Sequence, residues 1–207
     1  MLYLLIRRIL WIAIFIVIGF IVKILRTKRT KKKIGMVILM LCGCCVCLAV
    51  IIFPVENIFF KAQSPEEILQ YMTAKPPLGV AYGEQSCMAV YAERNSTYNN
   101  LIIPKKKDGY AIPSFDTSRR IYGAHLDTTV LSVYECEADY YILCMGAFPE
   151  RSISVTDSLG SQFGVINANA GSEVDLELNT YLFYAYLESF ADDYCITING
   201  ETFYVQN

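Results

Sequence analysis

The sequence predicts a membrane protein in which a two-helix transmembrane hairpin precedes a mainly antiparallel β domain of the α+β type with one short helix. Three observations lead to this fold class: two apolar runs near the N-terminus, a strongly basic segment between them, and a long acidic remainder with regularly spaced turn residues. The predicted units are a transmembrane hairpin (1–53) with a basic loop (23–33), a linker (54–63), a helix plus β-meander subdomain (64–118) and a β-sandwich-like subdomain (119–207).

The two apolar runs differ in how clearly they predict a membrane span. Residues 34–53 are 20 residues without a charge, and a helix of that length spans about 30 Å, the thickness of the hydrocarbon core. The uncharged part of the first run, 9–22, is only 14 residues long. We expect it to cross as well, because adding residues 1–6 places Arg7 and Arg8 near one end, where long basic side chains snorkel to the headgroups.

The charges predict the orientation. Seven Lys and Arg side chains lie within the 11 residues 23–33, and short loops rich in these residues stay on the cytoplasmic side. Residues 54–207 carry 9 basic and 20 acidic side chains, a formal charge of −11. We therefore expect a multi-pass protein of the cell membrane with residues 54–207 extracytoplasmic. The alternative, a cleaved signal peptide over residues 1–22, lacks a small-residue cleavage site and has its basic cluster on the wrong side.

The β domain is expected to begin with a short helix. Ser64-Pro65-Glu66-Glu67 combines a serine N-cap, a proline at the first helical position and acids in the first turn. The helix should end near Ala74, because two prolines follow. Apolar runs between turn residues then predict strands at 86–93, 100–104, 110–113, 128–136, 140–146, 152–156, 162–166, 174–178 and 181–187.

The last hairpin is specified in most detail, because Asn199-Gly200 is a preferred two-residue type I′ turn. The turn fixes the register, which is Ile198 opposite Glu201, Thr197 opposite Thr202, Ile196 opposite Phe203, and Cys195 opposite Tyr204. One face of the hairpin should be buried, namely Ile196, Ile198, Phe203 and Val205.

The eight cysteines form two groups. The candidate disulfide cysteines outside the predicted spans are Cys87, Cys136, Cys144 and Cys195. Their pairing is open, and reduced cysteines used as small buried hydrophobes are an equal alternative. We disfavour only the pair Cys136 and Cys144, because a hairpin turn near 137–139 would place Cys136 opposite Tyr140.

The other cysteines lie in the second apolar run, in the stretch LCGCCVCL. A lipobox at Leu41 to Cys44 is disfavoured, because apolar residues continue to Phe53 where a mature lipoprotein would begin a polar tether. A packing role fits better. Small residues recur four apart, a spacing that lets helices approach closely in lipid, against either the first helix or a second copy. These residues are Gly43 with Cys47, and Cys45 with Ala49.

The segments SPEEILQYM, SCMAVYAE and LIIPKKKDGYAIPS together resemble extracytoplasmic domains of small membrane- or lipid-anchored proteins of Gram-positive bacteria. In those domains a Ser-Pro-Glu-Glu helix leads into a meander with a Lys-Asp-Gly-aromatic turn. The terminal ITINGETFYV is similar to the strand–turn–strand that closes their second β unit. The resemblance covers residues 64–207, and it implies no catalytic residues.

The sequence contains little that indicates chemistry. His125 is the only histidine and Asp127 its nearest acid, and we interpret it as a surface or hydrogen-bonded residue. Gly160, Gly164 and Gly171 are too far apart for a phosphate loop and are interpreted as turn residues. Neither a calcium-loop motif nor a nucleophile motif is present. We expect no catalytic activity, cofactor, metal or nucleic-acid partner.

The sequence therefore favours a membrane-anchored extracytoplasmic module for binding or sensing, with its ligand unspecified. Expected partners are the lipid bilayer and, through the second helix, another membrane protein or a second copy. One alternative is a membrane-embedded accessory, such as a bacteriocin-immunity protein or an export-complex subunit. A weaker alternative is a thiol–disulfide exchange protein.

The predicted topology can be tested by labelling intact cells with a membrane-impermeant thiol reagent. Cysteines introduced after Glu56 should react, whereas cysteines at Thr27 or Thr30 should not, because the basic loop stays inside. The parent chain supplies the background from native thiols. Labelling of Thr27→Cys from outside would reverse the orientation.

Overall fold

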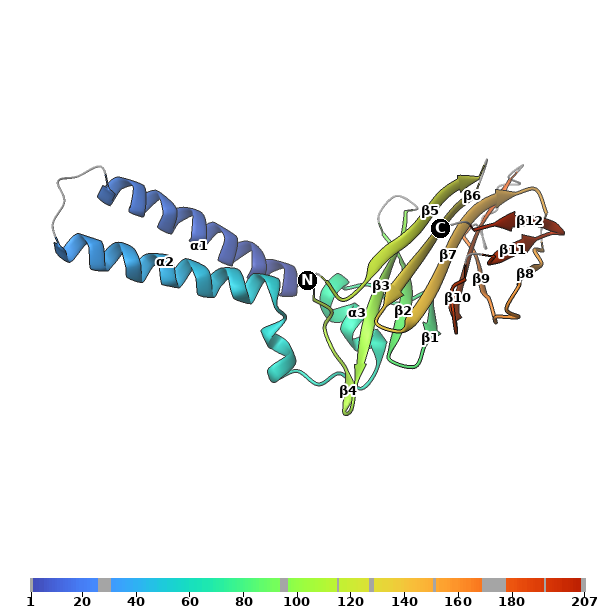
Figure 1. Cartoon of the computed structure of the whole chain (residues 1–207), viewed down its shortest axis with the longest axis horizontal. Helices are drawn as coiled ribbons and strands as arrows, with labels where there is room; N and C mark the ends of the chain where they lie inside the picture. The colour runs from blue at the N-terminus through green and yellow to red at the C-terminus, as the bar shows by residue number, and fades with distance from the viewer. Residues whose placement is uncertain are drawn as a thin grey trace.

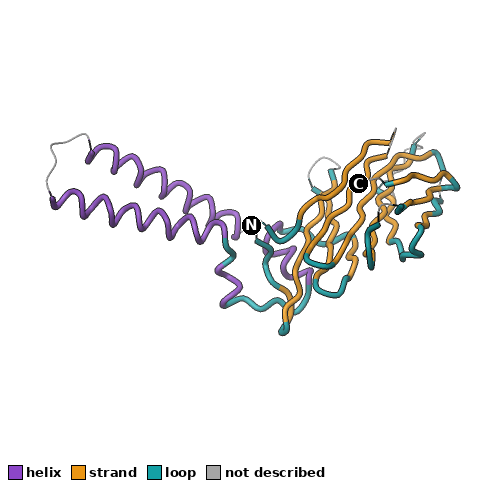
Figure 2. The backbone as a smooth tube through the Cα atoms, viewed as in Figure 1, coloured by secondary structure: helices purple, strands orange, loops and turns teal. Residues whose placement is uncertain are grey.

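The computed structural model describes residues 2–25, 31–93, 97–114, 116–126, 129–150, 152–168, 178–191 and 193–205. Two long apolar helices form a hairpin that extends away from a mostly antiparallel β domain with few helices (Figure 1). The tube view shows the same division into a helical part and a strand-rich part (Figure 2).

The hairpin consists of α1 (Leu2–Leu25) and α2 (Lys31–Ile52), which lie side by side (Figure 1). Both are long and apolar enough to cross a membrane, although a signal sequence shares these features. Ile14, Ile21 and Cys44 are buried between the helices, while many large apolar side chains face outward. A two-helix unit with this much apolar exposure is suited to a lipid surrounding.

Arg7 does not snorkel as expected, because its guanidinium binds the C-terminal end of α2. Nη1 donates to the carbonyl oxygens of Val50, at 3.0 Å, and of Ile51. Nη2 lies 3.5 Å from Oε2 of Glu56 in the short 3₁₀ helix η1 (Val55–Ile58). The last carbonyls of a helix lack intrahelical donors, and a cation there also complements the helix dipole. Arg7 thus joins both helices and η1 at the end nearest the β domain.

Helix α3 (Pro65–Thr73) confirms the predicted helix. Ser64 Oγ accepts from the backbone N–H of Glu67, and the Glu67 carboxylate accepts from the N–H of Gln63 at 2.9 Å. Ala74 ends the helix in the left-handed conformation. The α3 face toward the hairpin carries Tyr71, whose ring meets that of Tyr3 of α1 edge-on at 5.9 Å between centroids.

Three antiparallel sheets make up the rest of the described domain. The first has the order β1 (Gly79–Tyr82), β2 (Ser86–Ala92), β3 (Tyr98–Lys106), β4 (Gly109–Tyr110). The second has the order β5 (Arg119–Leu126), β6 (Thr129–Cys136), β7 (Asp139–Phe148), β10 (Asn179–Leu187), β9 (Gly164–Asn167). The third has the order β12 (Glu201–Tyr204), β11 (Cys195–Ile198), β8 (Val155–Asp157).

Most predicted strands are present, with several corrections. Strands β1 and β5 were not among the predicted strands, and the predicted strand 110–113 is reduced to the two residues of β4. Cys136 lies opposite Asp139 rather than Tyr140, because the β6–β7 turn has only two residues. The predicted strand 174–178 lies outside the described residues, apart from Leu178 at its end.

The β11–β12 hairpin confirms the predicted register at all four pairs. Asn199 and Gly200 both have positive φ, at 51° and 87°, as a type I′ turn requires. Ile196, Ile198 and Val205 are buried, and Phe203 packs against the same cluster.

The elements stack in four layers: α3, the four-stranded sheet, the five-stranded sheet and the three-stranded sheet. One hydrophobic cluster joins α3 to the first sheet, with Ile68 against Cys87 and Ile103. A second joins the two larger sheets, and includes Met88 and Leu182. A third fills the space between the five-stranded and three-stranded sheets. The two predicted subdomains therefore share the hydrophobic cluster between the two larger sheets.

The predicted linker contributes to the cluster between α3 and the first sheet. Ala62 is fully buried and pairs with Tyr110 as an isolated bridge. The side chain of Asn57 in η1 pairs with both backbone groups of Ile112, accepting from its N–H at 2.7 Å and donating to its carbonyl at 2.9 Å. The segment between the hairpin and α3 is thus tied to the domain.

Asp139 connects the two larger sheets. Its carboxylate is buried and accepts from the backbone N–H groups of Glu84, at 3.1 Å, and Gln85, at 2.9 Å, in the β1–β2 turn. It also accepts from Ser86 Oγ at 2.7 Å. A Cβ on Gly83 would lie 2.6 Å from this carboxylate, so the close approach of the turn requires glycine.

Asp139→Ala should lower the free energy of unfolding by about 3 kcal/mol, because the buried Ser86 hydroxyl and two part-buried backbone N–H groups lose their acceptor. The measurement is denaturant unfolding of the full chain in neutral detergent, followed by tyrosine near-ultraviolet circular dichroism. Asp193→Ala, at an exposed carboxylate, is the matched control. Equal unfolding midpoints for the two variants would contradict a connecting role for Asp139.

Candidate binding site at the sheet edges

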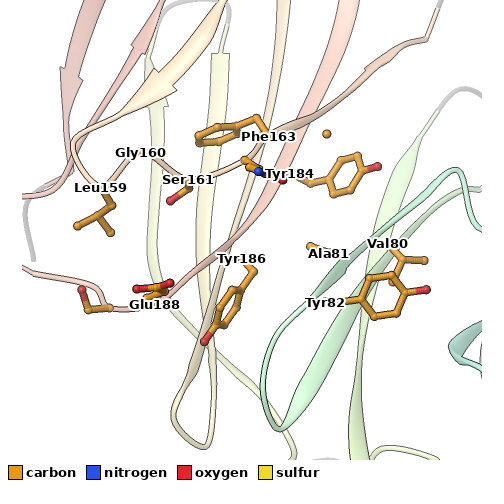
Figure 3. Close-up of a pocket in the computed structure, with 13 residues that line it drawn as sticks. Val80, Ala81, Tyr82, Leu159, Gly160, Ser161, Phe163, Tyr184, Tyr186 and Glu188 are labelled. Atoms are coloured by element: carbon orange, nitrogen blue, oxygen red, sulfur yellow. The ribbon is translucent and has the colours of Figure 1, made fainter.

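A cavity of about 710 Å³ lies where edge strand β1 of the first sheet approaches β10 and the segment that leads into β9 (Figure 3). Its lining residues are Val80, Ala81, Tyr82, Leu159, Gly160, Ser161, Gln162, Phe163, Gly164, Tyr184, Tyr186, Glu188 and Ser189. In Figure 3, Tyr184 and Tyr186 lie between the 159–163 segment and the β1 strand that carries Tyr82. The cavity thus opens between two stacked sheets.

Two glycines position the central ring of the site. An ideal Cβ on Gly79 would lie 2.0 Å from the Tyr184 hydroxyl oxygen, and one on Gly164 would lie 2.2 Å from Tyr184 Cζ. Both distances are far below van der Waals contact. Glycine at these two strand positions therefore leaves the slot that the ring of Tyr184 occupies.

The carboxylate of Asp157 fixes the turn at residues 157–161, which lines the side of the cavity opposite β1. One of its carboxylate oxygens accepts from the backbone N–H groups of Leu159, at 3.2 Å, and Ser161, at 2.8 Å, while the other accepts from the Tyr194 hydroxyl at 3.0 Å. Gly160 sits between them with φ of 73°, in the region that glycine tolerates. Side-chain bonds to the backbone fix such a turn, so this wall has a defined shape before any ligand arrives.

The lining combines aromatic rings, neutral polar groups and one carboxylate, that of Glu188. Burial raises the pKa of Tyr184 above its ordinary value, and burial together with nearby Glu66 raises the pKa of Tyr82. For Tyr186, burial and then Asp139 raise the pKa. All three hydroxyls are protonated at neutral pH. Those of Tyr184 and Tyr186 offer hydrogen-bond donors and acceptors beside apolar faces, whereas Tyr82 lies on the α3-facing side of the sheet with its strand partner Cys87.

The candidate disulfide cysteines are all free thiols. Cys87, Cys136 and Cys144 are buried, and burial raises the pKa of Cys87 and of Cys144 to about 12. Burial also raises the pKa of Cys136. The fourth thiol, Cys195, is only half-buried. In this structure three of the four serve as small hydrophobic side chains within the core clusters.

The packing prediction for α2 is wrong for the contact with α1. Gly43, Cys45 and Ala49 are exposed, and a Cβ added to Gly43 would meet no atom within 4 Å. The buried small residue is Cys44 instead, and Cys47 is half-buried. Gly43 and Cys45 each lie roughly 100° around the helix from Cys44, on opposite sides of it, because neighbouring helical residues are rotated by that angle. The packing of these small residues against a second copy stays a prediction.

His125 is exposed on strand β5, opposite Val130. Its predicted neighbour Asp127 lies outside the described residues. Within the part of the chain that the structure describes, no group of three or more His, Cys, Asp or Glu side chains has a geometry suited to a metal ion.

Comparison with known proteins returned no match to a family model, to a curated protein or to a solved structure. The resemblance to extracytoplasmic domains of Gram-positive bacteria therefore stays a prediction. What the structure defines is a class: a β-rich domain of stacked sheets, joined through a fixed connection to two apolar helices.

The sequence did not predict this site. Its residues come from three separated segments, and the aromatic ones have no distinguishing spacing. Gly164 did carry a usable signal, because a glycine inside a strand often marks the close approach of another group. From the sequence, Gly164 is interpreted as a turn residue and no strand is predicted at 79–82, so Gly79 and Gly164 are not brought together around one ring.

Gly164→Ala tests the slot. The new methyl should displace the Tyr184 ring and lower the free energy of unfolding by about 1–3 kcal/mol, the usual cost of overpacking. In a Tyr184→Ala background the same substitution should cost much less, and a double-mutant cycle from denaturant unfolding measures the difference. Additive effects would show that the glycine and the ring do not interact.

Proposed function

We propose that this chain is a membrane-anchored binding module on the extracytoplasmic side. Its ligand would be an extended polypeptide held in the cavity between β1 and the start of β9, which we call the cleft. The observation that carries the proposal is the cleft itself, which is preformed and bordered by two strand edges. The membrane location rests on the two apolar helices and on the basic segment between them.

The strand edges favour a polypeptide as the ligand. β1 pairs only with β2, and β9 only with β10, in the described sheets. Every second residue of an edge strand directs its N–H and C=O away from its neighbour, and an added strand can pair with these groups. Recognition by strand addition supplies affinity through the backbone and specificity through adjoining side-chain pockets.

The charges favour a basic ligand. Glu188 is the charged residue of the cavity lining, and residues 54–207 carry a formal charge of −11. An acidic field attracts cationic segments and speeds their association. The ring of Tyr186 adds a face over which a Lys or Arg side chain can lie.

Binding without catalysis is part of the proposal. The cavity lining has neither histidine nor cysteine, and the raised pKa values of its tyrosines keep their hydroxyls protonated and weakly nucleophilic. Thiol–disulfide exchange is disfavoured because it requires an accessible thiolate, whereas burial raises the pKa of Cys87 and of Cys144.

For the membrane-embedded alternative, deletion of residues 64–207 should spare part of the activity.

The ligand class can be tested with a labelled peptide of alternating valine and lysine, titrated against the full chain in neutral detergent by fluorescence anisotropy. Glu188→Gln should weaken binding about fivefold, since one ion pair contributes about 1 kcal/mol. Tyr186→Ala should weaken it about tenfold through loss of an aromatic contact. Tyr204→Ala, at an exposed tyrosine of β12, is the control.

Two peptide controls sharpen this test. Replacing central valines by proline removes backbone donors and should abolish strand addition. Replacing lysine by glutamate should abolish attraction to the acidic domain. Equal binding of all three peptides, or affinities unchanged by both cleft variants, would overturn the proposed ligand class.

A further inference from the structure

Helix η1 has its polar and apolar sides reversed relative to a water-soluble surface helix. Its polar residues point into the protein: Glu56 faces Arg7, and Asn57 pairs with the backbone of Ile112. Its apolar residues point outward, with Ile58 71% exposed and the following Phe59 87% exposed. This arrangement is unfavourable in water and favourable where lipid covers the apolar side.

Exposed apolar side chains also lie between the end of α2 and η1. Ile52 and Phe53 are more than half exposed, and Val55 follows after Pro54. In Figure 1, η1 lies beside the end of α2, at the same level along the helix direction, before the chain turns toward the β domain. If α2 crosses a membrane, η1 lies at the boundary between headgroups and acyl chains.

A basic hairpin tip stands next to this surface. A hollow of about 360 Å³ is lined both by the segment after η1, with Asn57, Phe60 and Lys61, and by the β3–β4 tip, with Lys106 and Lys107. Lys106 and Lys107 are exposed. Lys61 forms an ion pair with Asp108 at 3.2 Å, which removes the acid of the tip as a partner for the other two lysines.

We propose that Ile58 and Phe59 insert into the interfacial region of the outer leaflet, and that Lys106 and Lys107 bind the headgroups of anionic lipids there. Apolar insertion combined with attraction to anionic headgroups is the usual pair of forces for such a contact. The proposal rests on the proposed membrane insertion of α1 and α2. Its occupant is the bilayer, because exposed apolar side chains also lie between η1 and the helix that would enter that bilayer.

The contact would give the β domain a fixed orientation. Three attachments then lie around the end of the hairpin: the bond network of Arg7, the Tyr3–Tyr71 ring contact, and the lipid-bound η1 with its basic tip. A domain held at three points cannot swing freely about its tether. The cleft at the sheet edges would therefore face a constant direction relative to the membrane.

Tryptophan fluorescence with brominated lipids tests this directly, because the chain has a single tryptophan, Trp11 in α1. The full chain is reconstituted into vesicles of equal phosphatidylcholine and phosphatidylglycerol. Phe59→Trp is made in a Trp11→Phe background, and Tyr204→Trp in the same background is the matched exposed control. Tyr204 lies on β12, at the far end of the domain (Figure 1).

The tryptophan at position 59 should emit at shorter wavelength than the one at position 204. Lipids brominated near the headgroup end of the acyl chain should quench the tryptophan at position 59 several-fold more strongly than the tryptophan at position 204. Adding Lys106→Gln and Lys107→Gln should remove most of the gain in quenching that phosphatidylglycerol gives over phosphatidylcholine alone. If both lysines are present and quenching is the same with and without phosphatidylglycerol, Lys106 and Lys107 do not bind anionic headgroups.

Failure of this inference is separable from failure of the proposed function. If Trp11 of the unaltered chain is not quenched by lipids brominated at mid-chain, α1 is not in the bilayer and both proposals fall. If Trp11 is quenched and the tryptophan at position 59 behaves like the one at position 204, only the interfacial contact is wrong. A short emission wavelength without lipid quenching would mean that a protein surface covers the patch, which also overturns it.

Discussion

The arrangement of the β domain depends on the buried carboxylate of Asp139. It is the first residue of β7 and accepts hydrogen bonds from the β1–β2 turn, so it sets how the two larger sheets are aligned. A buried carboxylate is costly unless each lone pair finds a donor, and these donors come from a part of the chain more than fifty residues away. The alignment brings β1 beside β10, where the cleft forms.

A second constraint acts at the other end of the domain. The Arg7 side chain is largely buried. Its guanidinium donates hydrogen bonds to carbonyl oxygens at the end of α2 and faces Glu56. A guanidinium with donors in a fixed fork suits several acceptors at once. Helix, linker and domain thereby form one connected body, and any signal carried by the cleft or by the helices would pass through this junction.

Local signals in the sequence were reliable, and long-range ones were not. The Ser64 cap and the Asn199-Gly200 turn act over a few residues, and both gave the observed element with its boundaries. The slot for Tyr184 and the role of Arg7 depend on contacts between distant segments, which neither propensity nor spacing encodes. Gly43 shows the same limit, because its spacing predicted a helix contact but not the partner, and α1 packs on Cys44.

The four-layer stack leaves the strands at its centre without a solvent face. In β2, five consecutive residues from Ser86 to Val90 are fully buried, although the sheet is antiparallel. An antiparallel strand usually tolerates polar replacements at alternate positions, because one side meets water. We therefore expect polar substitutions to be tolerated best on the outermost strand, β12, and least in β2, where either face of the strand meets a packed layer.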